Sequence, residues 1–399
     1  MTDPLLSLAL LAETAVIGVW LWQHVEIGRI HREGLRVPSV EADDQTSDCP
    51  PLTVIVPARN EAGRIKECIE SVLGESIASM QVIVADDRSE DDTAGAVRAA
   101  AGGDRRVCLY RIDALPPGWL GKSHALWSAA QTATTEWLLF LDADCRILPG
   151  GLRSALRYAL DRRLDFLSLW PRDGSVGFWE RVLIPLCGAM IVIWYGSRRI
   201  NDPRFADAFA NGQFILVRRD AYLAMGGHAA VRDALIEDIP LARRAKASGL
   251  HTHAALGTDI YSVRMYGSLL EVVRGWRRIY VGVLRNHQIV LCVGSILAGS
   301  LLPFGLIGAC LGPVVRGAGG WWTVWLIAGL VHLVALVLAS LRFFGLARCR
   351  LDYLLFYPLS CAGVLAILAA ALVQRVRGGA VTWRGTEYRV DTSTIRPDK

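Results

Sequence analysis

The chain has 399 residues, of which 52% are apolar and 20% charged, and its formal net charge is +5. That length allows one soluble domain together with membrane segments, and a small net charge without a dense Lys/Arg stripe gives no case for nucleic-acid binding. The nine cysteines lie singly, without the spacing of zinc sites, which indicates a reducing compartment rather than a disulfide framework.

The chain begins with an apolar run from Leu5 to Trp22. The run approaches the roughly 20 residues that cross a bilayer core. No basic stretch precedes it and no A-x-A-type cleavage site follows it, so we expect an uncleaved transmembrane anchor over residues 1–27 rather than a signal peptide. The acidic stretch at 37–49 is expected to be a linker.

Strand-like and helix-like segments alternate in the region 50–285, which predicts an α/β domain. The expected strands are 52–57, 81–85, 107–112 and 137–141, and the expected helices are 61–73, 91–101 and 122–132. Such a βαβ series is typical of a sheet whose first strands run parallel.

A shorter apolar run, Val182 to Tyr195, interrupts this domain. Tryptophan and arginine residues flank it at positions 179, 181, 194, 198 and 199. Aromatic and basic anchors of this kind favour a helix over 176–199 that lies in the headgroup layer of a membrane. The alternative is a buried core helix of the soluble domain.

Three further apolar runs predict C-terminal membrane segments within 286–375, followed by a tail, 376–399. The runs are Ile289 to Val314, Trp321 to Leu341 and Tyr353 to Val373.

The arginines around the apolar runs predict the orientation in the membrane. Those after the first run and between the last two favour the cytoplasmic side, so we expect an integral inner-membrane protein with its 50–285 domain in the cytoplasm. These arginines are at positions 29, 32, 36, 342, 348 and 350. Three C-terminal spans would export the arginines of the tail, at positions 375, 377, 384 and 389. The side of the tail stays open, because one C-terminal segment could be re-entrant or interfacial.

Two acidic clusters follow strand-like runs of the soluble domain. Asp86 and Asp87 end the run at 81–85, and Asp142 and Asp144 end the run at 137–141. Carboxylates at the carboxyl ends of parallel strands lie in the crevice where open α/β sheets bind ligands. The pattern predicts a nucleotide site with a metal ion. Neither G-x-G-x-x-G nor a P-loop is present, so a dehydrogenase and a P-loop ATPase are not supported.

Together with other motifs, these clusters resemble family 2 glycosyltransferases. The motifs, in the order of that family, are 54–61 (VIVPARNE), 86–89 (DDRS), 142–144 (DAD), 212–214 (GQF), 226–227 (GG) and 236–238 (IED). The resemblance implies a GT-A fold and an inverting transfer from a nucleotide-diphosphate sugar.

The resemblance also implies the donor-binding residues. Asp87, beside Asp86, would face the nucleoside base, and the loop with Pro57, Arg59 and Glu61 would wrap the nucleoside. A carboxylate can accept the imide hydrogen of uracil, which favours a UDP-sugar donor. The alternative for Asp86 is that it caps the following helix.

Asp142 and Asp144 are the expected metal ligands. Two residues apart on an extended segment, their side chains lie on the same side. Carboxylates together with substrate phosphates suit Mg²⁺ or Mn²⁺, which would stabilise the departing UDP. Asp144 is the expected direct ligand. A lone D-x-D in a loop can also arise by chance.

Three further groups complete the expected site. Asp238 and Glu237 are the expected catalytic residues, and the resemblance implies that Asp238 is the general base that takes a proton from the acceptor hydroxyl. The alternative for Asp238 is a carboxylate that stabilises a helix N-terminus. Lys122, at a helix start, is expected to contact the diphosphate, or to be a solvated surface lysine.

The last motif departs from the family pattern. Processive and lipid-modifying relatives carry Q-x-x-R-W, whereas this chain has Arg274, Arg277 and Arg278 at the Gln, Arg and Trp positions. Arg274 and Arg277 are still expected to bind the donor, with a bidentate contact from Arg277 to the diphosphate. The missing tryptophan argues against a processive synthase.

The expected acceptor is a membrane lipid, because an interfacial helix at 176–199 and a basic helix at 267–287 would place the site beside the bilayer. The layout and the tail segment 382–388 are similar to those of bacterial enzymes that glycosylate ceramide, carotenoid acids or hopanoids. Two alternatives remain: a polysaccharide synthase, and a catalytically silent protein that binds a sugar nucleotide or a lipid. The intact Asp residues favour an enzyme.

Overall fold

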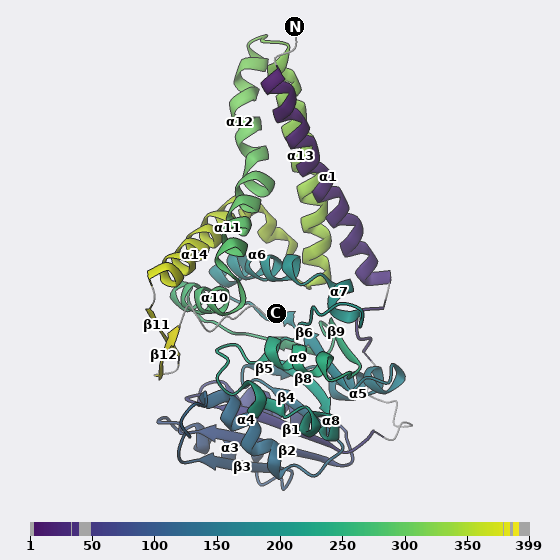
Figure 1. Ribbon diagram of the computed structural model, residues 1–399, viewed down its shortest axis with the longest axis vertical. Helices are drawn as coiled ribbons and strands as arrows, with labels where there is room; N and C mark the ends of the chain where they lie inside the picture. Colours follow the sequence, from purple (N-terminus) through teal and green to yellow (C-terminus); the bar gives the residue numbers. More distant parts are fainter. Residues whose placement is uncertain (1–3, 33, 40–48, 378, 384–385, 391–399) are drawn as a thin grey trace.

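The structure is a computed structural model that describes residues 4–32, 34–39, 49–377, 379–383 and 386–390. It has a sheet domain at one end and long helices at the other (Figure 1). Part of the predicted linker, residues 40–48, lies outside the described residues, as do Arg384 and Gly385 of the tail segment.

The main sheet has seven strands in the order β3-β2-β1-β4-β8-β6-β9. They are β1 (Leu52–Ala58), β2 (Met80–Asp87), β3 (Val107–Ile112), β4 (Trp137–Leu141), β6 (Phe166–Trp170), β8 (Phe214–Arg218) and β9 (Thr252–Leu256). Strands β1 to β4 run parallel, as predicted, whereas β8 is antiparallel to both β4 and β6. The predicted α/β fold is confirmed, and the sheet is mixed.

A second, small sheet has the order β5-β10-β7, formed by β5 (Cys145–Ile147), β10 (Tyr261–Val263) and β7 (Arg172–Asp173). Strands β11 (Gly379–Trp383) and β12 (Thr386–Val390) form a hairpin after the last helix.

Helices cover the main sheet, and three of them match the predicted ones. These are α2 (Ile65–Leu73), α3 (Thr93–Ala101) and α4 (Gly121–Thr132), and the others are α5 (Gly151–Asp161), α8 (Arg219–Ala224), η1 (Gly227–Val231) and α9 (Asp238–Ala247). Helix α3 starts later than predicted because the Asp92 side chain accepts a hydrogen bond from Gly95 N and caps the helix.

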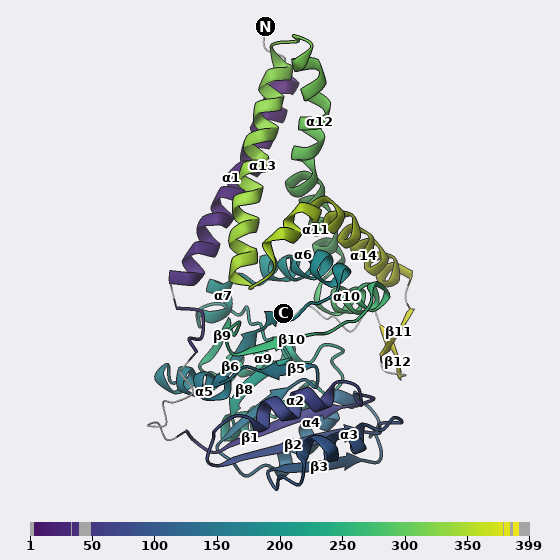
Figure 2. The same cartoon turned by 180° about the vertical axis from the view of Figure 1, so that it is seen from behind.

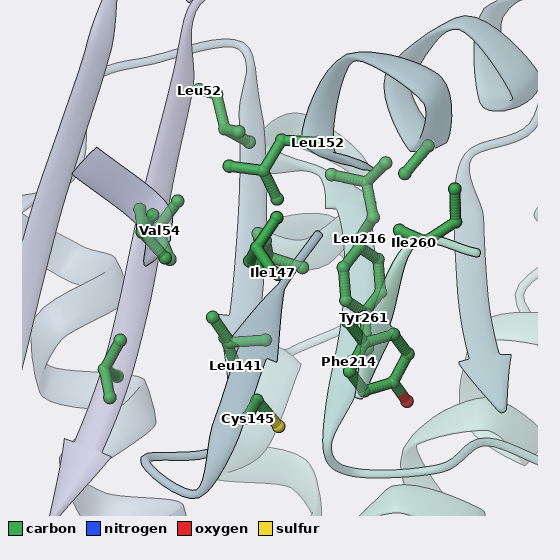
Figure 3. Close-up of a cluster of buried hydrophobic side chains, with 14 of the residues drawn as sticks. Leu52, Val54, Leu141, Cys145, Ile147, Leu152, Phe214, Leu216, Ile260 and Tyr261 are labelled. Atoms are coloured by element: carbon green, nitrogen blue, oxygen red, sulfur yellow. The ribbon is translucent and has the colours of Figure 1, made fainter. Parts of the chain in front are cut away.

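The two faces of the sheet follow from the alternation of side chains along each strand. On β1, Leu52 and Val54 join one buried cluster, while Ile55 packs into the cluster on the opposite face. Figure 3 shows the first cluster, in which Leu52, Val54, Leu152, Leu216 and others point toward one another. Each fully buried side chain of this size contributes about 1.5–3 kcal/mol, so the core holds the strand ends in fixed positions.

Four helical stretches are long and apolar enough to cross a membrane: Pro4–Ile30, Asn286–Val315, Trp321–Leu346 and Leu351–Arg377. They contain α1 (Pro4–Arg32), α11 (Asn286–Ser295), the π-helical η2 (Ile296–Leu301), α12 (Leu302–Val315), α13 (Trp321–Leu346), η3 (Leu351–Phe356) and α14 (Tyr357–Arg377). They match the predicted runs. Helices α1, α12 and α13 rise together from the sheet domain in both views (Figures 1 and 2).

Helix α14 lies in a different direction from this bundle. In Figures 1 and 2 it lies across the base of the bundle, near α6 and α10. Its C-terminal end is fixed there, because the Arg375 guanidinium donates to Asn286 Oδ1 (2.7 Å) and to Val281 O (2.6 Å).

Between the bundle and the sheet lie α6 (Phe178–Trp194), α7 (Ser197–Asn201) and α10 (Leu269–Val283). Helix α6 covers most of the segment predicted to be interfacial. Many of its side chains are buried in a cluster shared with α10 and α14, and Tyr280 Oη donates to Cys187 O (3.1 Å). Phe178, Trp179 and Ile193 are exposed. The helix therefore has features of both interpretations.

Candidate active site

The loops after β1 and β2 are held together at the carboxyl edge of the sheet. Asn60 and Arg88 both have positive φ (56° and 58°), which is uncommon for residues other than glycine and marks tight turns. Asn60 N donates to Ser89 Oγ (3.0 Å), and Glu90 N donates to Asn60 Oδ1 (2.8 Å). The two loops thus form one wall.

The adjacent aspartates Asp86 and Asp87 have different surroundings. Asp86 is buried, and its Oδ1 accepts a hydrogen bond from Ser89 N (3.1 Å), so it closes the turn after β2. Asp87 lines a cavity, where its carboxylate accepts from Arg88 Nε (2.8 Å) and lies 3.9 Å from the Arg59 guanidinium. A Cβ at Gly121 would collide with the Asp87 carboxylate, so this close approach of α4 requires glycine.

This cavity, called the polar cavity here, has a volume of about 620 Å³. It brings together eight predicted site residues: Pro57, Arg59, Glu61, Asp87, Lys122, Asp142, Asp144 and Arg274. Its volume lies in the range of pockets for small ligands and cofactors. Its wall carries both arginines and carboxylates, which suits a ligand with a nucleoside at one end and phosphates at the other.

Asp142 and Asp144 extend into the polar cavity from the end of β4. Burial, together with the nearby Asp142 and Glu61 carboxylates, raises the pKa of Asp144 to about 7. Among the described residues, no group of three or more His, Cys, Asp or Glu side chains is arranged to hold a metal ion. Two carboxylates that repel each other in the wall of this cavity nevertheless fit Mg²⁺ or Mn²⁺, which take the remaining ligands from phosphates and water.

Lys122 connects the two acidic motifs. Its Nζ lies 2.8 Å from Asp142 Oδ1 and 2.9 Å from Glu237 Oε1. Burial alone would lower the pKa of this ammonium, but the two carboxylates outweigh it and raise the pKa, so Lys122 stays protonated. The same contact outweighs the effect of burial on Glu237 and lowers the pKa of its carboxyl. Lys122 is therefore not a solvated surface lysine.

Asp238 is the first residue of α9, and its carboxylate is fixed by backbone amides. Oδ2 accepts from Gly212 N (2.8 Å), and Oδ1 accepts from Ile239 N (2.7 Å). A Cβ at position 212 would lie 3.1 Å from Asp238 Oδ2, so Gly212 allows the approach. Burial and the neighbouring Glu237 raise the pKa of Asp238 to about 7, which suits proton transfer near neutral pH.

Asp238 faces a second cavity of about 360 Å³, called the apolar cavity here. Its polar end includes Lys122, Asp142, Glu237 and Asp238, and the rest of the wall is mostly apolar. The apolar wall comes largely from α6, α10, α13 and the end of α1, for example Gly188, Ile279, Phe343 and Ile27. The two cavities share five lining residues, Lys122, Asp142, Gln213, Met265 and Arg278. They therefore meet beside Asp238.

The sequence did not predict this junction of the two cavities. Arg278, at the position of the missing tryptophan, lines both cavities, whereas Arg277, which the structure also describes, lines neither of them. In the sequence, Arg278 was noted only because it replaces the tryptophan of the motif, and no role was predicted for it. Gln213 is the middle residue of the GQF motif, but no role was predicted for it from the sequence.

Residues 53–225 match the model of the family described as "Glycosyl transferase family 2". This segment holds most of the residues that line the polar cavity, including Asp87 and the Asp142–Asp144 motif, whereas Arg274 and Arg278 lie outside it. The match confirms the resemblance to family 2 glycosyltransferases over these residues, and the mixed seven-stranded sheet agrees with the GT-A-type fold that the resemblance implies.

A curated relative is similar to nearly the whole chain. It is named 4,4'-diaponeurosporenoate glycosyltransferase, from Staphylococcus aureus, and is 26% identical over 346 residues, which cover 85% of this chain and 88% of the relative. The similarity thus extends beyond the segment matched by the family model.

Two solved structures are only distantly similar to this chain. The mannosyltransferase PcManGT from Pyrobaculum calidifontis, in complex with GDP-Man and Mn²⁺, has a TM-score of 0.49 and 20% identity, and covers 93% of this chain and 98% of that one. S. aureus TarS 1-349, in complex with UDP-GlcNAc, has a TM-score of 0.38 and 16% identity, and covers 82% of this chain and 91% of that one.

Proposed function

We propose that this chain, which carries a family 2 glycosyltransferase domain, transfers a sugar from a UDP-sugar to a hydroxyl or carboxyl group of a membrane lipid, with inversion at the anomeric carbon. The observation that carries the proposal is the junction of the polar and apolar cavities beside Asp238. A polar donor and an apolar acceptor would meet at this junction.

The polar cavity is the proposed donor site. Asp87 would accept the imide hydrogen of uracil, while Arg59 and Arg274 supply positive charge within the same cavity. Arg278 is proposed as a further contact to the diphosphate, because it lines both cavities where the sugar would lie.

The residues proposed to hold a Mg²⁺ or Mn²⁺ ion are Asp142 and Asp144, whose mutual repulsion favours a cation between them. When bound, the ion would offset the negative charge that develops on the departing diphosphate. The Lys122 ammonium lies between Asp142 and Glu237. Its positive charge would also offset the negative charge of the departing diphosphate.

Asp238 is the proposed base for a hydroxyl acceptor. The amides of Gly212 and Ile239 fix its carboxylate at the edge of the apolar cavity. Attack from this side would come from the face opposite the diphosphate, which leads to inversion. A carboxylate acceptor needs no base, because it is already ionised at neutral pH.

The mostly apolar wall beyond Asp238 favours a lipid acceptor over a growing polysaccharide, which needs a path lined by polar groups. The relative named for a carotenoid carboxylate supports the same acceptor class. Together with the four apolar helical stretches and the arginine pattern, this supports an inner-membrane enzyme whose active site faces the cytoplasm.

The direct test is UDP release by the purified protein in lipid nanodiscs, screened over UDP-sugars with the total lipid extract of the source cell as acceptor. We expect Mn²⁺- or Mg²⁺-dependent release and, by mass spectrometry, one lipid that has gained a hexose. Release with long sugar chains as product would instead support a synthase. No release with any UDP-sugar would overturn the proposal.

A matched pair of variants tests the metal ligands. Asp144→Asn removes a charge from the proposed site, so the metal-dependent rate should fall by about 10²-fold or more, because a metal ion supplies several kcal/mol of charge stabilisation. Asp104→Asn, which removes a carboxylate paired with Arg106 away from both cavities, is the control and should keep the wild-type rate. Equal rates in the two variants would contradict the role of Asp144.

A further inference from the structure

A third cavity, of about 310 Å³, lies between α1, α6 and α13 and is called the lateral groove here. It shares five lining residues with the apolar cavity: Ile27, Ile30, Pro185, Val192 and Phe343. The two cavities are therefore neighbours, separated by these side chains. Together they extend from Asp238 to the membrane-facing helices.

The rim of the lateral groove has the composition of a membrane interface. Trp22 and Arg29 line it from α1, and Arg198 and Arg199 line it from the segment after α6. Tryptophan and arginine gather where the hydrocarbon core meets the headgroups. Glu26 Oε1 lies 3.5 Å from Arg198 Nε, which joins α1 to this segment. The groove therefore opens at the depth of the lipid headgroups.

Beyond this rim, the helices that form the groove continue into an apolar surface. Large apolar side chains of α1 and α13 are exposed, for example Leu11, Val19, Val331 and Val334. Because acyl chains would cover such a surface in a bilayer, a lipid could pass from the bilayer into the groove without its chain entering water.

We propose that the acceptor lipid enters sideways from the bilayer through the lateral groove, and that one apolar chain stays between α1, α6 and α13 while its reactive group reaches Asp238. This inference rests on the proposed function and specifies the binding site of the acceptor chain. The mostly apolar walls suit a hydrocarbon or polyisoprenoid chain, and a shift of the shared side chains that separate the two cavities would join them into one path.

Gly188 on α6 allows a sharp test. It lines the apolar cavity, and a Cβ at this position would meet no heavy atom of the described chain within 4 Å. Gly188→Leu therefore places a branched side chain in the path from a Cβ position that is open. Leucine also has a higher helix propensity than glycine, so the helix should not be weakened.

Gly305→Leu on α12 is the matched control. This glycine also has open space at its Cβ position, and among the described lining residues it belongs to none of the three cavities. The two variants make the same chemical change in two apolar helices and differ in whether the new side chain lies in the proposed path.

The experiment measures sugar transfer to 4,4'-diaponeurosporenoate, the acid in the name of the S. aureus relative, in phosphatidylglycerol vesicles, with UDP binding as the check of folding. We expect Gly188→Leu to lower kcat/KM for the lipid at least tenfold while it still binds UDP, and Gly305→Leu to match the wild type. Equal transfer by both variants would overturn the lateral path. No transfer by the wild type to this acid or to the lipid extract would overturn the proposed function itself, and the inference with it.

A second measurement does not depend on turnover or on the folding of one variant. A single-chain alcohol with a photoreactive diazirine at the end of its chain, added to the same vesicles, should label wild-type residues around the lateral groove. Ala189→Leu, which narrows the groove from α6, should reduce this labelling. Labelling confined to α12, or unchanged in Ala189→Leu, would contradict the proposal.

Discussion

At the scale of single residues, the protonation of Asp238 controls the expected pH dependence. Burial and Glu237 raise its pKa to about 7, against the opposing effect of Lys122. A base must be deprotonated, so we expect kcat/KM with a hydroxyl lipid to rise about tenfold per pH unit below 7 and to level off above it. The measurement is the pH profile of transfer. A value of kcat/KM that does not change from pH 5 to 8 would contradict the role of Asp238 as the base.

The Asp238→Asn variant separates the two acceptor classes at the same position. With a hydroxyl lipid, loss of the base should cost about 10²–10⁴-fold in rate. With a carboxylate lipid there is no proton to remove, so the loss should be much smaller. Asparagine keeps the acceptor oxygen for the amide of Gly212, and UDP binding should persist.

At the scale of secondary-structure elements, a polar contact inside the apolar bundle joins α1 to α13. His332 Nδ1 lies 2.7 Å from Glu13 Oε1, and both residues are buried. The other ring nitrogen of His332 lies 2.9 Å from Gly299 O in η2, and Trp20 Nε1 donates to the same oxygen (2.7 Å). Paired polar groups of this kind connect helices within a bilayer.

Removal of this contact should loosen α1. Glu13→Ala leaves the buried Nδ1 of His332 without its partner, so we expect a loss of stability of about 1–3 kcal/mol, measured by thermal unfolding in detergent micelles. Thr14→Ala is the control, because the Thr14 hydroxyl is exposed and donates only to Leu10 O of its own helix. If Glu13→Ala unfolded at the same temperature as the Thr14→Ala control, the contact between Glu13 and His332 would not stabilise the bundle.

At the scale of the whole molecule, the direction of α14 bears on the side of the C-terminal tail. Because Arg375 is bound to Asn286 and Val281 at the base of the bundle, we propose that α14 returns to the side of the sheet domain rather than crossing the bilayer. A fluorescent protein fused after residue 399 should then fluoresce in the cytoplasm, and a periplasmic phosphatase reporter at the same point should be inactive. The reverse pattern would show that α14 crosses.

This arrangement removes the conflict that the arginines of the tail created in the sequence. With α1, α11–α12 and α13 as the crossing segments, the tail and the sheet domain lie on one side, in agreement with the positive-inside rule. Length and apolar composition cannot separate a crossing helix from one that lies across the bundle, since both need long apolar surfaces.

The sequence by itself determined the division into a sheet domain and apolar helices, the alternation of strands and helices up to β4, and the resemblance of one segment to family 2 glycosyltransferases. These features depend on local patterns: alternation along strands, the length of apolar runs, and motifs at strand ends. It also indicated which residues would gather at the site, since the carboxyl ends of parallel strands share one edge. The roles of Asp87, Asp144 and Asp238 stay predictions.

Only the tertiary structure decided how these groups meet. Lys122 lies between Asp142 and Glu237, Arg278 lines two cavities, and the apolar cavity adjoins the lateral groove, and each of these arrangements joins residues far apart in the chain. Such contacts depend on how α1, α6, α10 and α13 pack, and side-chain packing between distant segments leaves no periodic trace in the sequence.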